Sequence, residues 1–246
     1  MRWEPGTTCT YTVKFSEARR ERDRLVDISD EHLLHTTVLE STEGLATIKT
    51  GTEPIRYDSR ITEIAGGRVI DHATRSEPRT ATWKVDTRNM FYMTSAGHFT
   101  GPSGEFVVPV ALIPLVLFLP IMPEGPIRVG QSWEAPVFIV DLDPGAGKGS
   151  LLRIPIAMKL EAMAGEATRL ARISYGCRLR RKFANDLGEE ELVLDGMIDF
   201  AADAGVLIRK SERLTYHLRR FRMVDDRREL FESFDTDKSI SADRRP

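Results

Sequence analysis

The sequence has few cysteines and no excess of charge of either sign. Cys9 and Cys177 are the only cysteines in 246 residues, too few for a disulfide scaffold. Two separately buried thiols are the expected state, although an oxidising compartment would allow one bond between them. Lysine and arginine number 35 against 37 aspartate and glutamate residues, which gives a formal net charge of −2. This balance argues against a dedicated nucleic-acid binder, which is usually basic.

The start of the chain lacks the pattern of a secretory signal. MRWEPGTTCTYTV contains no charged segment followed by an apolar one, and no small-residue lipoprotein pattern precedes Cys9. With Met1 as the native start, we expect a cytoplasmic protein. If a signal peptide was trimmed before this start, we expect the bacterial cell envelope instead.

Catalytic motifs are missing or incomplete. No G-x-S-x-G elbow and no HExxH pair occurs in the sequence. The segment from Gly145 to Ser150 resembles a phosphate-binding loop, but Gly149 follows Lys148 where that loop needs a hydroxyl. His32 and His35 would point to opposite faces of a strand, as solvated surface residues. We therefore expect no enzyme, no metal ion and no cofactor.

One strongly apolar run, Phe106 to Met122, stands out near the middle of the chain. A membrane-spanning helix needs about 20 apolar residues. This run is shorter and is interrupted by Pro109, Pro114 and Pro120, each of which costs about 3 kcal/mol in a helix interior. We expect no transmembrane span, but a short kinked helix or an extended segment buried under a sheet. The alternative is a lid that contacts a lipid-like ligand or a partner.

Most of the remaining chain alternates apolar and polar residues, which is typical of half-buried strands. The apolar residues from Cys9 to Phe15 share one face, as do Leu214, Tyr216 and Leu218. Short turns such as the one from Ala65 to Arg68 join such segments as hairpins. The pattern predicts roughly a dozen strands, because hairpin signals separate the alternating runs.

These strands predict a mainly β fold. We expect one large curved antiparallel sheet, a half-barrel with meander connectivity, with the apolar run packed on its concave side as a short helical or extended insertion. An antiparallel meander needs no crossover helices, and it must curl to bury one face. Residues 1–235 are predicted to form a single domain and residues 236–246 a mobile polar tail. The conformation of Ser16–Asp27 is not decided by its pattern, which is consistent with an exposed helical turn and with a solvated strand end.

A short motif follows the apolar run. Leu119-Pro120 and the segment Pro126 to Trp133, PIRVGQSW, resemble the LP…P-x-x-V-x-V-G-D-x-W signature of an uncharacterised family of bacterial β-rich envelope proteins. Tyr57 to Ser59, and Gly196 to Phe200 with Gly205 before a long strand, are also similar to that family. Its members resemble the lipoprotein-carrier fold. The resemblance therefore implies a curved half-barrel around short helices, whose concave side binds acyl chains.

The chain departs from that family in two respects. Gln131 replaces the usual acidic residue of the motif, and no signal peptide is visible. No catalytic residues are known for the family, so the resemblance implies none here.

Three functions are consistent with these patterns. The first is a non-enzymatic binding protein for a lipid or other hydrophobic ligand, with Leu112, Leu115, Phe118 and Trp133 near the ligand; it predicts an apolar cavity. The second is a structural module whose groove is filled by its own apolar run, with a homodimer or protein partner across a sheet edge. The third is a hydrolase or isomerase with a polar cleft of converging acids or histidines.

A weak site for an anionic headgroup is also predicted. Arg178, Arg180 and Lys182 share one strand face, and Arg219 points outward on a later strand. If these strands are neighbours, the arginines form a basic patch that donates bidentately to headgroup oxygens. The alternative is an ordinary outer face whose cations alternate with Glu191 and other acids.

The substitution Leu115→Asp separates the first two functions. If Leu115 is part of the core, an unpaired buried carboxylate costs several kcal/mol and the protein unfolds. If Leu115 lines a ligand pocket, the fold survives and ligand binding is lost. Thermal unfolding measured beside lipid binding distinguishes these outcomes, and a variant that loses neither contradicts both placements.

Overall fold

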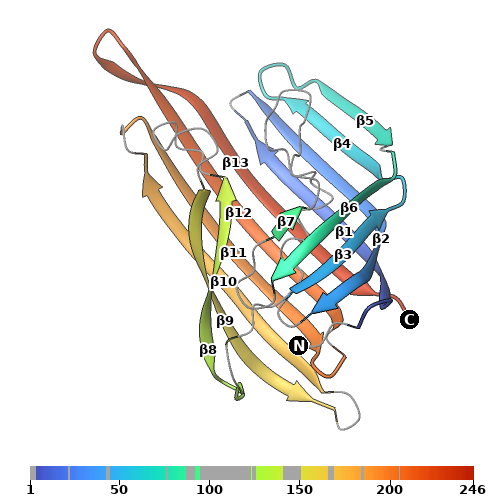
Figure 1. Cartoon of the computed structure of the whole chain (residues 1–246). Helices are drawn as coiled ribbons and strands as arrows, with labels where there is room; N and C mark the ends of the chain where they lie inside the picture. Colours follow the sequence, from blue (N-terminus) through green and yellow to red (C-terminus); the bar gives the residue numbers. More distant parts are fainter. Residues whose placement is uncertain are drawn as a thin grey trace.

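The computed structural model describes residues 4–21, 23–42, 45–75, 77–86, 92–94, 123, 126–140, 151–165, 169–183, 186–204 and 206–246. Strands make up the regular structure of this part, and they join in one 13-stranded antiparallel sheet (Figure 1). The N-terminal strands are β1 (Thr8–Arg20), β2 (Arg24–Thr42), β3 (Leu45–Thr52), β4 (Arg56–Glu63), β5 (Val69–Arg75), β6 (Arg79–Asp86) and β7 (Tyr92–Thr94). The C-terminal strands are β8 (Ser132–Val140), β9 (Leu151–Ala164), β10 (Leu170–Lys182), β11 (Gly188–Ala201), β12 (Val206–Val224) and β13 (Arg227–Arg244). The predicted mainly β fold is confirmed.

The first and last strands meet in the middle of the sheet. The order is β7-β6-β3-β2-β1-β13-β12-β11-β10-β9-β8, so β13 joins an N-terminal arm to a C-terminal meander. Among the described residues no pairing connects β7 with β8, so the sheet is open. Figure 1 shows the sheet twisting and curving between these two edges. No helix that could span a membrane is present in the described part of the chain.

Strand β2 has two different partners on one side. Its first half, Arg24 to Asp30, pairs with β4, and its second half, Leu34 to Thr42, pairs with β3. On its other side β2 pairs with β1 from Leu25 to Thr37. The β4–β5 hairpin is therefore a side branch of the sheet, because β5 pairs only with β4 among the described strands.

One face of the sheet, here called the inner face, carries the hydrophobic core. It is the face onto which Tyr11, Val13 and Phe15 of β1 point. The core cluster continues over β2, β13, β12, β11, β10 and β9, and its fully or nearly fully buried members include Leu34, Ile173, Ile198, Phe200 and Ala242. The opposite side is called the outer face. This division follows the period-two alternation of the sequence.

The predicted mobile tail is wrong. Residues from Thr236 to Arg244 form the second half of β13, which pairs with β1 on one side and with β12 on the other. The inward positions of this segment are Thr236, Lys238, Ile240 and Ala242. Small and polar side chains at these positions hid the alternation, because apolar periodicity is the signal by which strands are recognised.

The segment whose conformation the sequence left open forms strand ends. Within Ser16–Asp27, β1 continues to Arg20 and β2 begins at Arg24, so the segment forms two strand ends rather than a helical turn. Beyond Met223, β12 turns at Asp225 and Asp226, both of which have positive φ angles, into β13. The apolar run from Phe106 to Met122 lies outside the described residues, and so does the predicted insertion on the concave side.

Gly196 on β11 allows a tyrosine ring to lie flat against the sheet. Tyr175 is its direct partner on β10, and a Cβ atom at Gly196 would lie 2.1 Å from the ring carbon Cζ. Any larger side chain must therefore displace the buried ring. The ring position also directs the Tyr175 hydroxyl toward β12, where it meets a carboxylate described below.

We expect Gly196→Ala to destabilise the protein by about 1–3 kcal/mol, the usual cost of overpacking a core. Gly66→Ala is the matched control, since nothing lies within 4 Å of its added Cβ. Urea denaturation of both variants measures the difference. Equal midpoints for Gly196→Ala and the wild type would show that the ring has room to move.

Candidate functional site

A buried ion pair lies within the inner face of β12. Lys210 and Glu212 are both buried, and the Lys210 Nζ lies 3.0 Å from the Glu212 carboxylate. The Tyr175 hydroxyl donates a hydrogen bond of 2.6 Å to the same carboxylate. Burial lowers the pKa of Lys210, an effect that Glu212 opposes, and burial raises the pKa of Tyr175. The three side chains form one compact polar cluster inside the core.

A second polar cluster follows at one end of the inner face. Glu190 of β11 is buried, forms an ion pair with Arg181 of β10 and accepts a hydrogen bond of 2.7 Å from the Tyr216 hydroxyl. Burial of the Tyr216 ring raises the pKa of its hydroxyl. As in the first cluster, one buried carboxylate is held by one cation and one tyrosine.

The first and last strands carry a third polar contact. Glu17 of β1 is buried, lies 3.4 Å from the Lys238 ammonium and accepts a hydrogen bond of 3.3 Å from Thr236. Both partners belong to β13. A buried carboxylate without a partner would be costly, so this contact favours one pairing of β1 with β13.

A buried Asp–His pair lies beside the branch point of β2. The His32 Nδ1 and the Asp30 carboxylate are 2.6 Å apart, and their side chains are 2% and 1% exposed. Among the described residues the other ring nitrogen, Nε2, has no hydrogen-bond partner. His32 was predicted to be a solvated surface residue, and that prediction is wrong.

The buried charges could have been found by extending the apolar pattern. Leu214, Tyr216 and Leu218 are inward on β12, and the same parity places Lys210 and Glu212 inward as well. On β2, His32 likewise has the parity of the buried Leu34. The charged residues were assigned to the surface because ionisable side chains are rarely buried unless they are paired.

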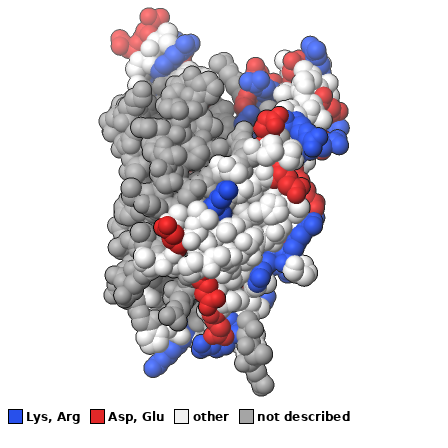
Figure 2. Space-filling model, turned by 45° about the vertical axis from the view of Figure 1, so that its right-hand side comes forward, with Lys and Arg blue, Asp and Glu red and all other residues white. Residues whose placement is uncertain are grey.

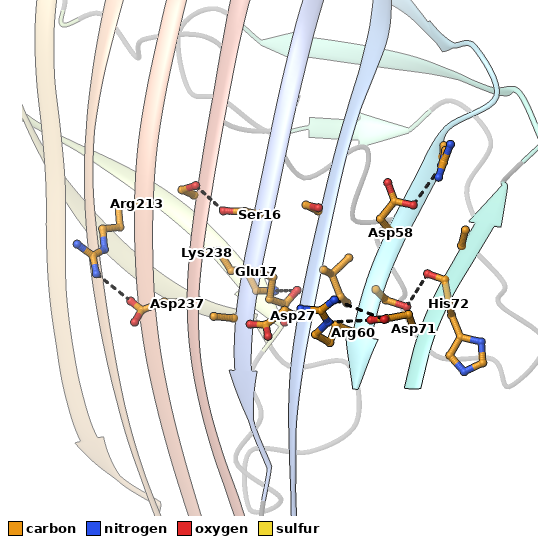
Figure 3. A pocket seen from close by; sticks show the side chains of 17 residues that line it. Ser16, Glu17, Asp27, Asp58, Arg60, Asp71, His72, Arg213, Asp237 and Lys238 are labelled. Carbon is orange, nitrogen blue, oxygen red and sulfur yellow. Dashed lines mark hydrogen bonds and ion pairs between the residues drawn. The ribbon is translucent and has the colours of Figure 1, made fainter. Parts of the chain in front are cut away.

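The outer face carries a polar groove with a volume of about 1000 Å³ (Figure 3). Two rows of cross-strand partners, which share one face of the sheet, form most of its surface. One row is Asp237, Ala18, Asp27, Arg60 and Asp71, and the next is Ser239, Ser16, Ser29, Asp58 and Ala73. The alanine and serine side chains in these rows are small, and the space above them is the hollow of the groove. A smaller hollow of about 250 Å³ shares Ala18, Asp27 and Asp237 and extends the groove.

The charges of the groove are mostly neutralised in pairs. Arg60 donates to Asp71 at 2.8 Å, Arg56 donates to Asp58 at 3.1 Å, and Arg213 lies 3.5 Å from Asp237. Figure 2 shows charges of both signs interspersed on a face of the molecule rather than separated by sign. Exposed pairs of this kind contribute little to stability, about 0–1 kcal/mol each.

Several acids and hydroxyls of the groove are bound to neighbouring side chains. The hydrogen bond from Arg60 lowers the pKa of Asp71, whereas a general acid or base at neutral pH needs a pKa near the working pH. The hydroxyls of Ser16 and Ser239 are 2.8 Å apart and bond to each other. His72 and its cross-strand partner Ser59 also line the groove, and the Ser59 hydroxyl donates a hydrogen bond of 3.4 Å to the His72 backbone carbonyl. No group of side chains suited to a metal ion is found among the described residues.

Both thiols are free in the structure. Cys9 is buried and Cys177 is partly buried, on β1 and β10 respectively. Burial raises the pKa of Cys177 to about 11, so this thiol is protonated at neutral pH. A protonated, partly buried thiol is a poor nucleophile.

Of the four residues predicted to lie near an apolar ligand, Trp133 is described. It is half-buried on β8, packs against the core cluster and is the cross-strand partner of Met158. Leu112, Leu115 and Phe118 lie outside the described residues.

The predicted headgroup site does not form one continuous basic patch. Arg178 and Arg180 are exposed on β10, but β11 separates β10 from β12, which carries Arg219. Glu191 of β11 is the direct partner of Arg180. Arg219 binds Asp235 at 2.7 Å and 3.1 Å. Cations and acids thus alternate across these strands, and anion binding by the three arginines stays a prediction.

No protein-family model and no curated protein matches the chain. Among solved structures, it is similar to Pseudomonas aeruginosa OccK7 (OpdD), with 10% sequence identity over 98% of this chain and 99% of that chain. The TM-score of 0.32 is too low to support an inference about fold or function. The β-rich architecture is therefore established by the strands of the structure and not by this comparison.

We expect Lys210→Met to destabilise the protein by about 3–5 kcal/mol, because it leaves the Glu212 carboxylate buried without its cation. Adding Glu212→Gln removes that charge while keeping an acceptor for Tyr175. The double variant should therefore regain at least half of the lost stability in urea denaturation. If it is as unstable as the single variant, the two side chains are not energetically coupled.

Proposed function

We propose that the protein is a non-enzymatic binding protein that holds a lipid or other hydrophobic ligand against the inner face of its curved sheet. The observation that carries this proposal is the continuous apolar cluster on that face. It runs from β3 through the central strands to β8, in a sheet that is open rather than closed. The members of this cluster are buried in the protein itself, so we place the ligand at the border of the cluster, where Trp133 and Ile127 are only partly buried.

Trp133 supports a place for the ligand at the β8 edge. Its indole packs against the core but is only partly buried. The Ile127 side chain also packs against the core and is also only partly buried. A large aromatic ring in that position offers contact area to an apolar ligand. Both residues belong to the motif that resembles the envelope family, which favours the cell envelope as the compartment of this function.

The groove on the outer face supports a binding role over an enzymatic one. Its carboxylates are ion-paired, and the pKa of Asp71 lies below its ordinary value. Carboxylates held in ion pairs are poor general acids and bases at neutral pH, so the paired charges of the groove do not favour a hydrolase or isomerase.

A structural or interaction module is the second candidate, because of the sheet edges. β8 pairs only with β9, and β7 only with β6, among the described strands. An unpaired edge is a template for a strand of a second copy or another protein. Pro136 on β8 removes one donor from that edge, which is a common protection against such pairing.

Native mass spectrometry with lipid extraction tests the binding function. We expect an acyl-chain species at about one per chain, because one continuous apolar face offers one site. Trp133→Ala should weaken the affinity for this species about five- to thirtyfold, seen as a lower occupancy, while the fold persists, since a lost aromatic contact is worth on the order of 1–2 kcal/mol. Met163→Ala, an exposed position on the adjacent strand, is the control and should keep full occupancy.

A bare polypeptide mass, together with an unchanged melting temperature across a panel of lipids, would contradict the binding function. That result would favour the structural module. Analytical ultracentrifugation would then test for a homodimer, the predicted form of an edge-paired assembly.

A further inference from the structure

Exposed apolar side chains gather at one end of the sheet. The turns β1–β2, β4–β5 and β12–β13 all lie at this end, here called the hairpin end, as the antiparallel registers require. Of the nine large exposed hydrophobic residues in the part of the chain that the structure describes, six belong to this end: Leu25, Ile64, Val69, Met223, Leu230 and Phe231. A bias of this kind is unusual for single surface hydrophobics, which normally scatter.

The β12–β13 hairpin projects beyond its neighbours at this end (Figure 1). The last β11 partner on β12 is Arg220, and the last β1 partner on β13 is Asp235. Beyond these residues the two strands pair only with each other within the described part of the chain. This projecting part of β12 and β13 is here called the ribbon. A two-stranded ribbon is only marginally stable by itself in water, so contact with another surface would stabilise it.

The apolar residues of the ribbon lie close together. Phe221 is the direct partner of Leu230, and a register shift leaves Phe231 without a cross-strand partner. Met223 is 53% exposed, Leu230 44% and Phe231 45%. The Arg228 guanidinium stacks on the Phe221 ring at 3.6 Å, so an apolar cluster with a cation at its border projects into solvent.

The arrangement of the six residues fits a flat apolar surface better than a protein partner. They occur on three separate turns across the width of the sheet, and in Figure 1 the β4–β5 and β12–β13 turns stand apart at the same end. A protein partner uses one contiguous patch, whereas a bilayer meets every protruding turn of one end at once.

The charges of the ribbon predict the kind of lipid surface. Between Arg220 and Glu232 the ribbon has four arginines, at positions 220, 222, 227 and 228, and four acids, at positions 225, 226, 229 and 232. Arg220 pairs with Glu232 at 2.9 Å and Arg222 with Glu229 at 3.6 Å. A ribbon without net charge gains little from anionic headgroups, so its attachment depends on apolar contact.

We propose that the hairpin end of the sheet docks on a lipid bilayer, with Met223, Leu230 and Phe231 entering the headgroup boundary. The inference rests on the proposed function, because a carrier of acyl chains must collect or deliver them at a lipid surface. It adds the place of contact, an end of the sheet distinct from the β8 edge that carries Trp133.

Flotation with phosphatidylcholine vesicles tests the docking. The wild type should float with these vesicles, and adding phosphatidylglycerol or raising the salt concentration should change the bound fraction less than about threefold. The triple variant Met223→Ser, Leu230→Ser, Phe231→Ser should lose at least about tenfold in vesicle binding. The control Leu39→Ser, Met163→Ser changes side chains of similar exposure outside the hairpin end and should bind like the wild type.

A fluorescence measurement keeps the test independent of folding in the triple variant. Met223→Trp should show a blue shift of the added indole on mixing with vesicles, and Leu39→Trp should not. A wild type that does not float, or equal loss in the triple variant and the control, would overturn the docking. Attachment that needs anionic lipid and vanishes with salt would also overturn it in favour of an electrostatic contact.

The outcomes separate this inference from the proposed function. If lipid co-purifies but the protein does not float, the docking is wrong and the binding function stands. If the protein floats through the hairpin end but carries no lipid, the docking stands as a means of surface attachment and the carrier function is wrong.

Discussion

The pairing of β1 with β13 is the contact on which the sheet depends. It joins residues from opposite ends of the chain, from Tyr11 with Arg244 to Arg20 with Asp235, and without it the N-terminal arm and the C-terminal meander would be two separate sheets. Contacts on both faces of the sheet favour this register of β1 with β13. Ser16 meets Ser239 on the outer face, and Glu17 meets Lys238 on the inner face. A slip of one residue would bury serines and expose the charged pair. Contacts of such long sequence separation form slowly, because the loop between them must close first.

Much of the architecture follows from local sequence pattern, and the exceptions have a physical cause. Alternation predicted the strands around Cys9 to Phe15 and Leu214 to Leu218, and turn residues predicted the β4–β5 hairpin. It did not reveal the second half of β13, where three of the four inward residues, Thr236, Lys238 and Ala242, are polar or small. It also did not reveal which strands are neighbours, because a strand's own pattern records which face is buried and not what lies beside it. For this reason the sequence did not show that β11 separates the strand of Arg180 from the strand of Arg219.

The candidate sites were predicted less well than the fold. Trp133 was identified from a motif, but the clusters around Glu212, Glu190 and Asp30 were not, since each charge is tolerated inside only through a partner from another strand or a neighbouring residue. These clusters interrupt an otherwise apolar inner face at intervals. A face that combines apolar surface with fixed polar groups suits an amphiphile better than a pure hydrocarbon, since a headgroup prefers polar surroundings. The chemistry of the inner face and the exposed hairpin end therefore support the same class of ligand.

The direction of β1 and β13 determines how the sheet would respond to mechanical load. Their free ends, near Tyr11 and Arg244, lie side by side at one end of the pair, and Arg245 donates its backbone N–H to the Thr10 carbonyl at 2.8 Å. Hydrogen bonds between antiparallel strands are perpendicular to the strands. A force that separates these two ends therefore loads one pair of hydrogen bonds at a time, as in opening a zipper, and never the whole row in shear. The contact that unites the two halves of the sheet is, along this direction, also the one that yields first.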